Sequence, residues 1–161
     1  MGLVVQTQDG QKWLQKQADV LACLCHRFKA NAIQTPTRGD APVDALLVRH
    51  NEVVAVVEIK CRQFSLDTLR EYGDGLVTAS KVQDGIHTGA LLRVPFIVVF
   101  GLPDGSVVYW HISDKHGVKQ FHWLEKHTPT KATSQTDAVV HRNNAFLPVS
   151  KMKVLYANNV A

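Results

Sequence analysis

The sequence lacks the marks of several protein classes. Its three cysteines include no C-x-x-C pair, which argues against a disulfide framework and against a cysteine-rich zinc site. The first apolar stretch is too short for a signal peptide, and no later run approaches the length of a membrane span. Neither G-x-x-x-x-G-K nor G-x-G-x-x-G occurs, so nucleotide hydrolysis has no supporting motif. We therefore expect a soluble, cytoplasmic protein that does not contact membranes.

Length and charge suggest one domain with an uneven surface. At 161 residues and 45% hydrophobic content, the chain suits a single domain over residues 1–161. Residues 1–110 carry eleven basic and eleven acidic residues, whereas residues 111–161 carry seven and three. We therefore expect a core over about residues 11–112 and a basic C-terminal extension over about residues 113–161. The extension suits contact with DNA, and a solvated basic tail is the alternative.

The apolar spacing predicts helices in three places. Residues 11–30 form an amphipathic pattern, with an apolar stripe that is most simply core packing. Ser65 is a good N-cap for a short helix over residues 65–72. Residues 80–93 read as a further helix, which Pro95 ends.

Apolar runs separated by turn residues predict two β-hairpins. The first joins residues 43–49 to residues 53–61 across the polar residues 50–52, after a proline-containing loop over residues 35–42. The second joins residues 96–100 to residues 107–112 across Pro103-Asp104-Gly105. The Thr-rich residues 128–137 read as an exposed loop, and order is expected to return over residues 145–156. With the helices, this gives the order α-β-β-α-β-β.

The first hairpin carries the residues that suggest chemistry. Glu58 and Lys60 share one face of their strand, because alternate residues point to the same side, while Ile59 and Cys61 point to the other. With a three-residue loop at 50–52, Asp44 lies directly opposite Glu58. A two-residue loop would turn Asp44 to the wrong face, unless a bulge restores the register.

Two opposed carboxylates can share a small hard cation. Their Cβ atoms would lie about 5 Å apart, close enough for both to bind Mg²⁺ or Mn²⁺. Such an ion orients a phosphate and lowers the pKa of an attacking water, and Lys60 could position that water or offset charge on the phosphate. The alternative is a plain ion pair between Glu58 and Lys60 at a strand end.

The order Pro42-Val43-Asp44, then Glu58-Ile59-Lys60 after a hairpin, resembles the PD-(D/E)xK nuclease superfamily. That resemblance spans residues 11–112 and implies an α/β fold, a mixed central sheet flanked by helices with a restriction endonuclease-like α-β-β-β-α-β core around a divalent cation. The first motif departs from P-D, since Asp44 stands one place later. The resemblance implies that Asp44, Glu58 and the Ile59 carbonyl bind Mg²⁺ or Mn²⁺, and that Lys60 is catalytic.

The same resemblance implies further site residues on helices. A helix after the core strands often supplies a polar residue, for which Lys81 is the first candidate and Gln83 and Asp84 are weaker ones. A solvent-facing Lys81 is the alternative. An acid on the first helix sometimes joins the metal site, and Asp19 is the acid available there.

The function implied is that of a metal-dependent nuclease that cuts DNA in repair, recombination, restriction or phage DNA processing. Cutting both strands of a duplex would most simply use a homodimer, an inference from symmetry alone. A non-catalytic nucleic-acid-binding module of the same fold, or a structural subunit of a larger assembly, is the alternative. Substrate form and sequence preference depend on loops that the sequence leaves open.

Three other patterns carry less. Five of the eight histidines follow residue 110, yet their spacing fits no common zinc pattern, so exposed or phosphate-facing histidines are the simpler reading. Cys61 is expected to face the core as a buried apolar residue. The aromatic and basic residues between 115 and 127 suit either core packing, which we favour, or base stacking.

Overall fold

The computed structural model describes residues 8–36, 41–131 and 139–156. The helices are α1 (Gln8–Phe28), α2 (Leu66–Tyr72), α3 (Ala79–Leu92) and the short 3-10 helix η1 (Val149–Lys151). The strands are β1 (Asn31–Gln34), β2 (Ala45–Arg49), β3 (Glu52–Cys61), β4 (Asp74–Thr78), β5 (Phe96–Gly101), β6 (Val107–Ser113), β7 (Leu124–Lys131), β8 (Val139–Pro148) and β9 (Lys153–Tyr156). In the described ranges, no helix is both long and apolar enough to span a membrane.

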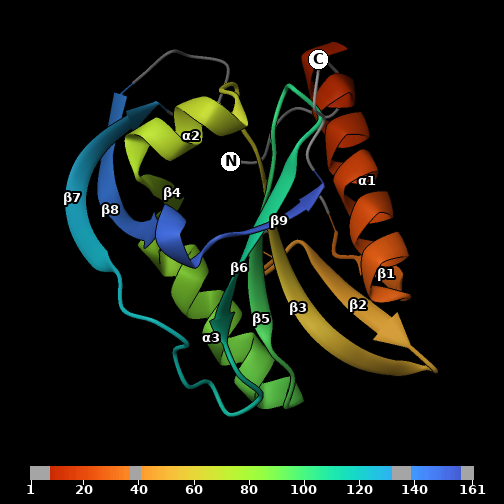
Figure 1. Cartoon of the computed structure of the whole chain (residues 1–161). Coiled ribbons are helices and arrows are strands. Elements are labelled where there is room, and N and C mark those ends of the chain that lie inside the picture. Colours follow the sequence, from red (N-terminus) through yellow and green to blue (C-terminus); the bar gives the residue numbers. More distant parts are fainter. Residues whose placement is uncertain (1–7, 37–40, 132–138, 157–161) are drawn as a thin grey trace.

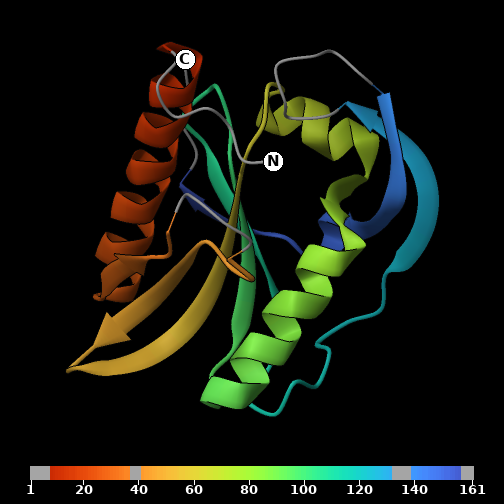
Figure 2. The same ribbon diagram turned by 180° about the vertical axis from the view of Figure 1, so that it is seen from behind.

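The strands form two sheets. The larger has six strands in the order β1-β2-β3-β5-β6-β9, and the smaller has three in the order β4-β8-β7. Among the described strands of this sheet, only β3 and β5 pair in parallel, so the larger sheet is mixed. Helix α1 covers one face of that sheet, whereas α2, α3 and the smaller sheet lie on the other side (Figures 1 and 2). The expected α/β fold, with a mixed central sheet flanked by helices, is confirmed.

The expected core order appears with an insertion. The elements α1, β1, β2, β3, α3 and β5 follow one another as α-β-β-β-α-β, and α2 and β4 are inserted between β3 and α3. The cap at Ser65 forms as expected, since its Oγ accepts from the Thr68 backbone N–H at 3.2 Å. β1 and β4 were not expected, because each has only four or five residues and little apolar alternation.

Two glycines let the layers on the α3 side approach the sheet. A Cβ on Gly85 of α3 would lie 2.1 Å from the Phe96 ring, and one on Gly75 of β4 would lie 2.7 Å from the Trp110 ring. Both rings are fully buried. Close approach at these two points lets α3 and β4 pack directly against side chains of β5 and β6.

The β2–β3 hairpin reaches the expected register by an unexpected route. Its turn has two residues, His50 and Asn51, both with positive φ, instead of the three expected, and Arg49 pairs with Glu52. A bulge between Leu47 and Val48 then shifts the ladder by one residue, so Ala45 pairs with Val57. The prediction of a three-residue loop was wrong. The bulge nevertheless places Asp44 and Glu58 on the same face, as that prediction required.

The C-terminal third is part of both sheets. β8 pairs with β4, and β9 pairs with β6 at the edge of the larger sheet. The described strands after residue 113 therefore belong to the same two sheets as strands of the core expected at 11–112. Residues 128–131 belong to β7 instead of an exposed loop, while 132–137 of that loop lie outside the described residues. Trp123 is buried and packs edge-on against Phe121, so these aromatics are core residues as favoured.

Candidate active site

Glu58 and Lys60 lie near the carboxyl end of β3, on the face that looks toward α3. Their neighbours Val57 and Ile59 belong to the apolar cluster under α1, so alternation along the strand separates charged from apolar side chains. Lys60 Nζ lies 2.8 Å from Glu58 Oε1. The Glu58 side chain is only 1% exposed and that of Lys60 is 29% exposed. The pair is thus covered on the carboxylate side and open to solvent on the ammonium side.

Asp44 continues the ladder one step beyond β2 and lies beside Glu58. Its backbone N–H donates to the Val57 carbonyl at 3.0 Å, and its Oδ2 accepts from the Ile59 N–H at 2.7 Å. The charge of Asp44 contributes to raising the pKa of Glu58, as a neighbouring carboxylate does. The three charged residues that the sequence singled out therefore meet at one place.

The Glu58 carboxylate is incompletely compensated. Burial, the largest effect, raises its pKa, Lys60 opposes that shift, Asp44 adds to it, and Lys81 opposes it weakly. The contact with Lys60 is a close ion pair that is not aligned as a hydrogen bond, and Oε2 has no hydrogen-bond partner among the described residues. Because a buried charge is unfavourable unless it is paired, this carboxylate is suited to a bound cation.

Lys81 reaches the same region from the first turn of α3. Its Nζ donates to the Ala41 carbonyl at 2.9 Å, across the segment that leads to Asp44. The lysine is half-buried, so the solvent-facing alternative is wrong. Gln83 and Asp84, the weaker candidates, are exposed.

The backbone of Ile59 faces the same strand edge as Asp44. In an antiparallel ladder, the N–H and C=O of one residue point to the same neighbour. The Ile59 N–H meets Asp44 Oδ2 at 2.7 Å, so its carbonyl points toward the edge that β2 leaves uncovered beyond Ala45. Two carboxylates and one carbonyl suit Mg²⁺, which keeps several waters. No group of three or more His, Cys, Asp or Glu positioned for a metal occurs among the described residues.

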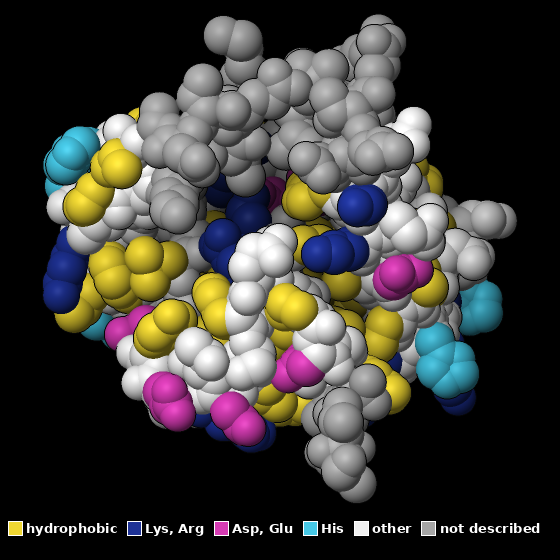
Figure 3. All heavy atoms as spheres, turned by 90° about the horizontal axis from the view of Figure 1, so that it is seen from above, with side chains coloured by type: hydrophobic (Ala, Val, Ile, Leu, Met, Phe, Trp, Pro, Cys, Tyr) yellow, Lys and Arg dark blue, Asp and Glu magenta, His cyan; other side chains and the backbone are white. Residues whose placement is uncertain are grey.

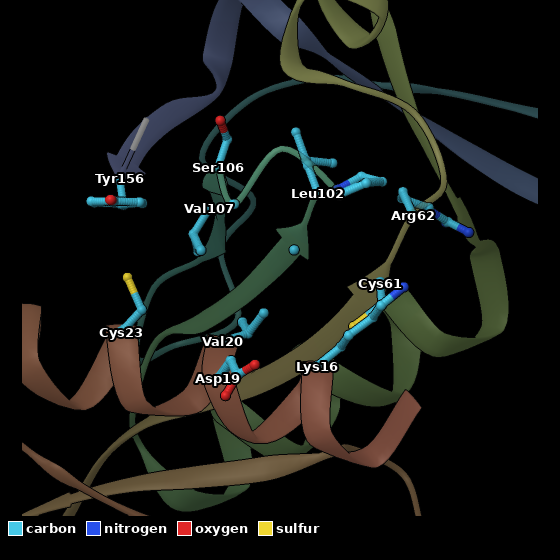
Figure 4. Close-up of a pocket in the computed structure, with 13 residues that line it drawn as sticks. Lys16, Asp19, Val20, Cys23, Cys61, Arg62, Leu102, Ser106, Val107 and Tyr156 are labelled. Carbon is cyan, nitrogen blue, oxygen red and sulfur yellow. The ribbon is translucent and has the colours of Figure 1, made fainter. Parts of the chain in front are cut away.

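Asp19 and Cys61 lie on the other side of the sheet. Both line a cavity of about 450 Å³ between α1 and the ends of β3 and β5, together with Lys16 (Figure 4). Asp19 Oδ1 accepts from Gln15 Nε2 at 3.0 Å. The prediction that Asp19 joins the metal site is therefore corrected, since α1 presents it to the face opposite Glu58. Cys61 faces α1 as expected but is half-buried, and burial raises the pKa of its thiol.

Arg62 lies just beyond β3, two residues after Lys60, and was not singled out from the sequence. It continues the alternation of Glu58 and Lys60, which is the signal that could have found it. Its guanidinium carbon lies 4.8 Å from the centre of the Phe100 ring, and it donates to the Leu76 carbonyl of β4. Burial lowers its pKa. Figure 3 looks onto this end of the molecule, where Lys and Arg side chains gather around a hollow.

Comparison with known proteins shows a partial likeness to solved structures. No protein-family model and no curated protein matches the sequence. Among solved structures, the Holliday junction resolvase Hjc of the archaeal hyperthermophile Archaeoglobus fulgidus aligns with a TM-score of 0.48 and 16% sequence identity. The alignment covers 61% of this chain and 75% of the resolvase chain. Most of the aligned side chains therefore differ between the two proteins.

Proposed function

We propose that this chain is a metal-dependent nuclease of the PD-(D/E)xK type that hydrolyses phosphodiester bonds in DNA. One observation carries the proposal: Asp44, Glu58 and Lys60 converge near the end of β3, and a buried oxygen of Glu58 has no partner among the described residues. A structural ion pair would need only Glu58 and Lys60. The second carboxylate beside them adds repulsion that a divalent cation would relieve.

The residues fit Mg²⁺ or Mn²⁺. Asp44, Glu58 and the Ile59 carbonyl would hold the ion, and its oxygen ligands match the preference of these metals. When bound, the ion supplies Lewis-acid stabilisation of the phosphate and a lower pKa for an attacking water.

The lysines have separate tasks in this proposal. Lys60 is open enough to meet solvent, and its ammonium holds a water or a phosphate oxygen in line for attack. Lys81 anchors the segment before Asp44 through the Ala41 carbonyl and adds positive charge near the phosphate. In this proposal both ammonium groups act by their positive charge, which holds and orients the substrate.

The cellular role proposed is DNA repair, recombination, restriction or phage DNA processing in the cytoplasm. A homodimer would place two such sites on a duplex, one for each strand. The rival proposal is a module of this fold that binds nucleic acid without cutting it. Retention of both carboxylates and the lysine favours the enzyme.

Cleavage of labelled DNA tests the proposal. Duplex, single-stranded and branched substrates are incubated with Mg²⁺, with Mn²⁺ or with EDTA. We expect cleavage with either metal, none with EDTA, and loss of cleavage with retained binding in Lys60→Ala. Lys115→Ala is the matched control, because Lys115 is an exposed lysine in the turn after β6. If the protein binds DNA but does not cut it with either metal, the nuclease proposal is rejected in favour of the binding module.

A further inference from the structure

The β7–β8 hairpin extends beyond the sheet that supports it. β4 pairs with β8 only over Asp74–Thr78 against Asn144–Pro148, whereas β7 pairs along its whole length with Val139–Phe146 of β8. The backbone of residues 127–131 and 139–143 therefore forms a two-stranded ribbon, beside which no third strand lies among the described residues. A ribbon of this kind has little stability of its own, so its length calls for a reason.

The described side chains of the ribbon are donor-rich and none is acidic. On one face, His127 and His141 stack with ring centres 5.8 Å apart, and His127 Nδ1 shares a hydrogen bond of 3.1 Å with Asn143 Oδ1. On the other face, Arg142 pairs with Thr128. At the base, Lys126 lies 5.3 Å from the centre of the Phe146 ring. Glu125 lies below the ribbon and accepts from Trp123 Nε1 at 3.3 Å.

The ribbon points to the end of the molecule that holds the candidate site. Its far end and the carboxyl end of β3 lie on the same side in both views of the chain (Figures 1 and 2). DNA bound at the end of β3 would thus extend past the ribbon. The two regions belong to different sheets, so the ribbon can act on binding without altering the carboxylates.

We propose that this ribbon is an arm that binds duplex DNA beside the cleaved bond. A two-stranded β-ribbon fits the major groove of B-DNA, and arginine, histidine and asparagine donate to phosphates and to base edges. The deep, narrow major groove of double-stranded RNA would not admit it. The choice of DNA as the ligand rests on the proposed nuclease function. The charge and shape of the ribbon are observed independently of that function.

Binding without metal tests the arm separately from catalysis. Fluorescence anisotropy is measured in EDTA with a labelled DNA duplex of about two helical turns, over a series of salt concentrations. We expect Arg142→Gln to weaken binding about fivefold or more and to reduce the slope of log K against log salt by about one. His127→Ala with His141→Ala should weaken binding from the other face, and Arg142→Lys should recover the salt slope because it keeps the charge.

The matched control is Arg27→Gln, an exposed basic residue in the last turn of α1, at the opposite end of the molecule. Unfolding midpoints of all variants are compared to confirm that each is folded. Equal affinity of the wild type, Arg142→Gln and the double histidine variant would overturn the arm, whether or not the protein cuts DNA. If these variants bind DNA more weakly and the wild type does not cut DNA, the proposed DNA-binding role of the ribbon is supported and the proposed nuclease function is contradicted. If the same variants weaken binding of single-stranded DNA as much as binding of the duplex, the ribbon does not act by fitting the major groove.

Discussion

The two faces of β3 differ most where the strand ends. Toward α1, Val57 and Ile59 are buried in an apolar cluster. Toward α3, Val56 is equally buried, yet the next residues on that face are Glu58, Lys60 and then Arg62. The end of β3 thus carries apolar core residues on the α1 side and charged residues on the α3 side.

The comparison of the two faces shows where burial of a side chain opposes folding. Ile59 and Glu58 are each 1% exposed, so both are equally removed from water. Burial stabilises the folded state through Ile59 and opposes it through the charge of Glu58. A strand between two packed layers has no structural need for that carboxylate, which supports a ligand-binding role for its face.

The largest expected effect is on the charged face. Asp44→Asn should keep an acceptor for the Ile59 N–H, so the loop before β2 stays in place. The loss of its charge should reduce metal-dependent cleavage about 10³-fold, because a ligand of the ion and part of its electrostatic attraction are removed. Single-turnover rates over a Mg²⁺ titration measure this. Wild-type rates at all Mg²⁺ concentrations would show that the two faces do not differ in function.

The apolar face should respond in stability instead. Ile59→Ala removes a side chain that is fully buried under α1, and we expect the free energy of unfolding to fall by about 2–5 kcal/mol. Denaturant titration in EDTA measures this, and the midpoint should move with little change in slope. Cleavage by the molecules that remain folded should persist, since the backbone carbonyl is retained. A loss of cleavage without a loss of stability would reverse the assignment of the two faces.

The pH dependence of stability should distinguish the wild type from Glu58→Gln. The pKa of Glu58 is raised above its ordinary 4.5 chiefly by burial, so the folded state holds a proton that the unfolded state releases. The free energy of unfolding of the metal-free protein should therefore fall as pH rises from 4.5 through the raised pKa, and this fall should be absent in Glu58→Gln.

Added metal gives the matching control for Glu58. Mg²⁺ at about 100 times its Kd should stabilise the wild type by about 2.7 kcal/mol, and it should have far less effect on Glu58→Gln. Thermal unfolding at several pH values, with and without Mg²⁺, measures both effects. A metal-free wild type that gains stability with pH in this window would contradict the assigned burial of the charge.

The smallest effect is expected at Cys61, next to Lys60 but on the α1 face. Cys61→Ala should lower the free energy of unfolding by about 1 kcal/mol or less and leave cleavage unchanged. Burial raises the pKa of the thiol, so it should alkylate more slowly in the folded protein than in urea. Mass spectrometry of the Cys61 peptide measures this, and equal rates in both states would show that the cavity beside α1 does not shield it.

Local chemistry along the chain was enough to predict much of the framework. The apolar stripe of α1, the cap at Ser65, the helix that ends near Pro95 and the alternation in β3 each depend on residues that are close in sequence. For the same reason, the pairing of Glu58 with Lys60 on one face followed from strand periodicity alone. Asp44 and Glu58 as a shared cation site followed from the hairpin register, whereas the Ile59 carbonyl and Lys81 came from the family resemblance. The catalytic and metal-binding roles of all these residues stay predictions.

The tertiary structure alone decided what depends on distant partners. β1 and β4 are strands because β2 and β8 offer them hydrogen-bonding edges, not because of their own composition. The polar residues 128–131 form a strand for the same reason, and Asp19 lies on the wrong face because of how α1 packs. The bulge at Leu47 corrects the register that the short turn at His50 would otherwise spoil. Periodicity is a local property, whereas register and sheet membership are set by energies shared between strands far apart in the chain.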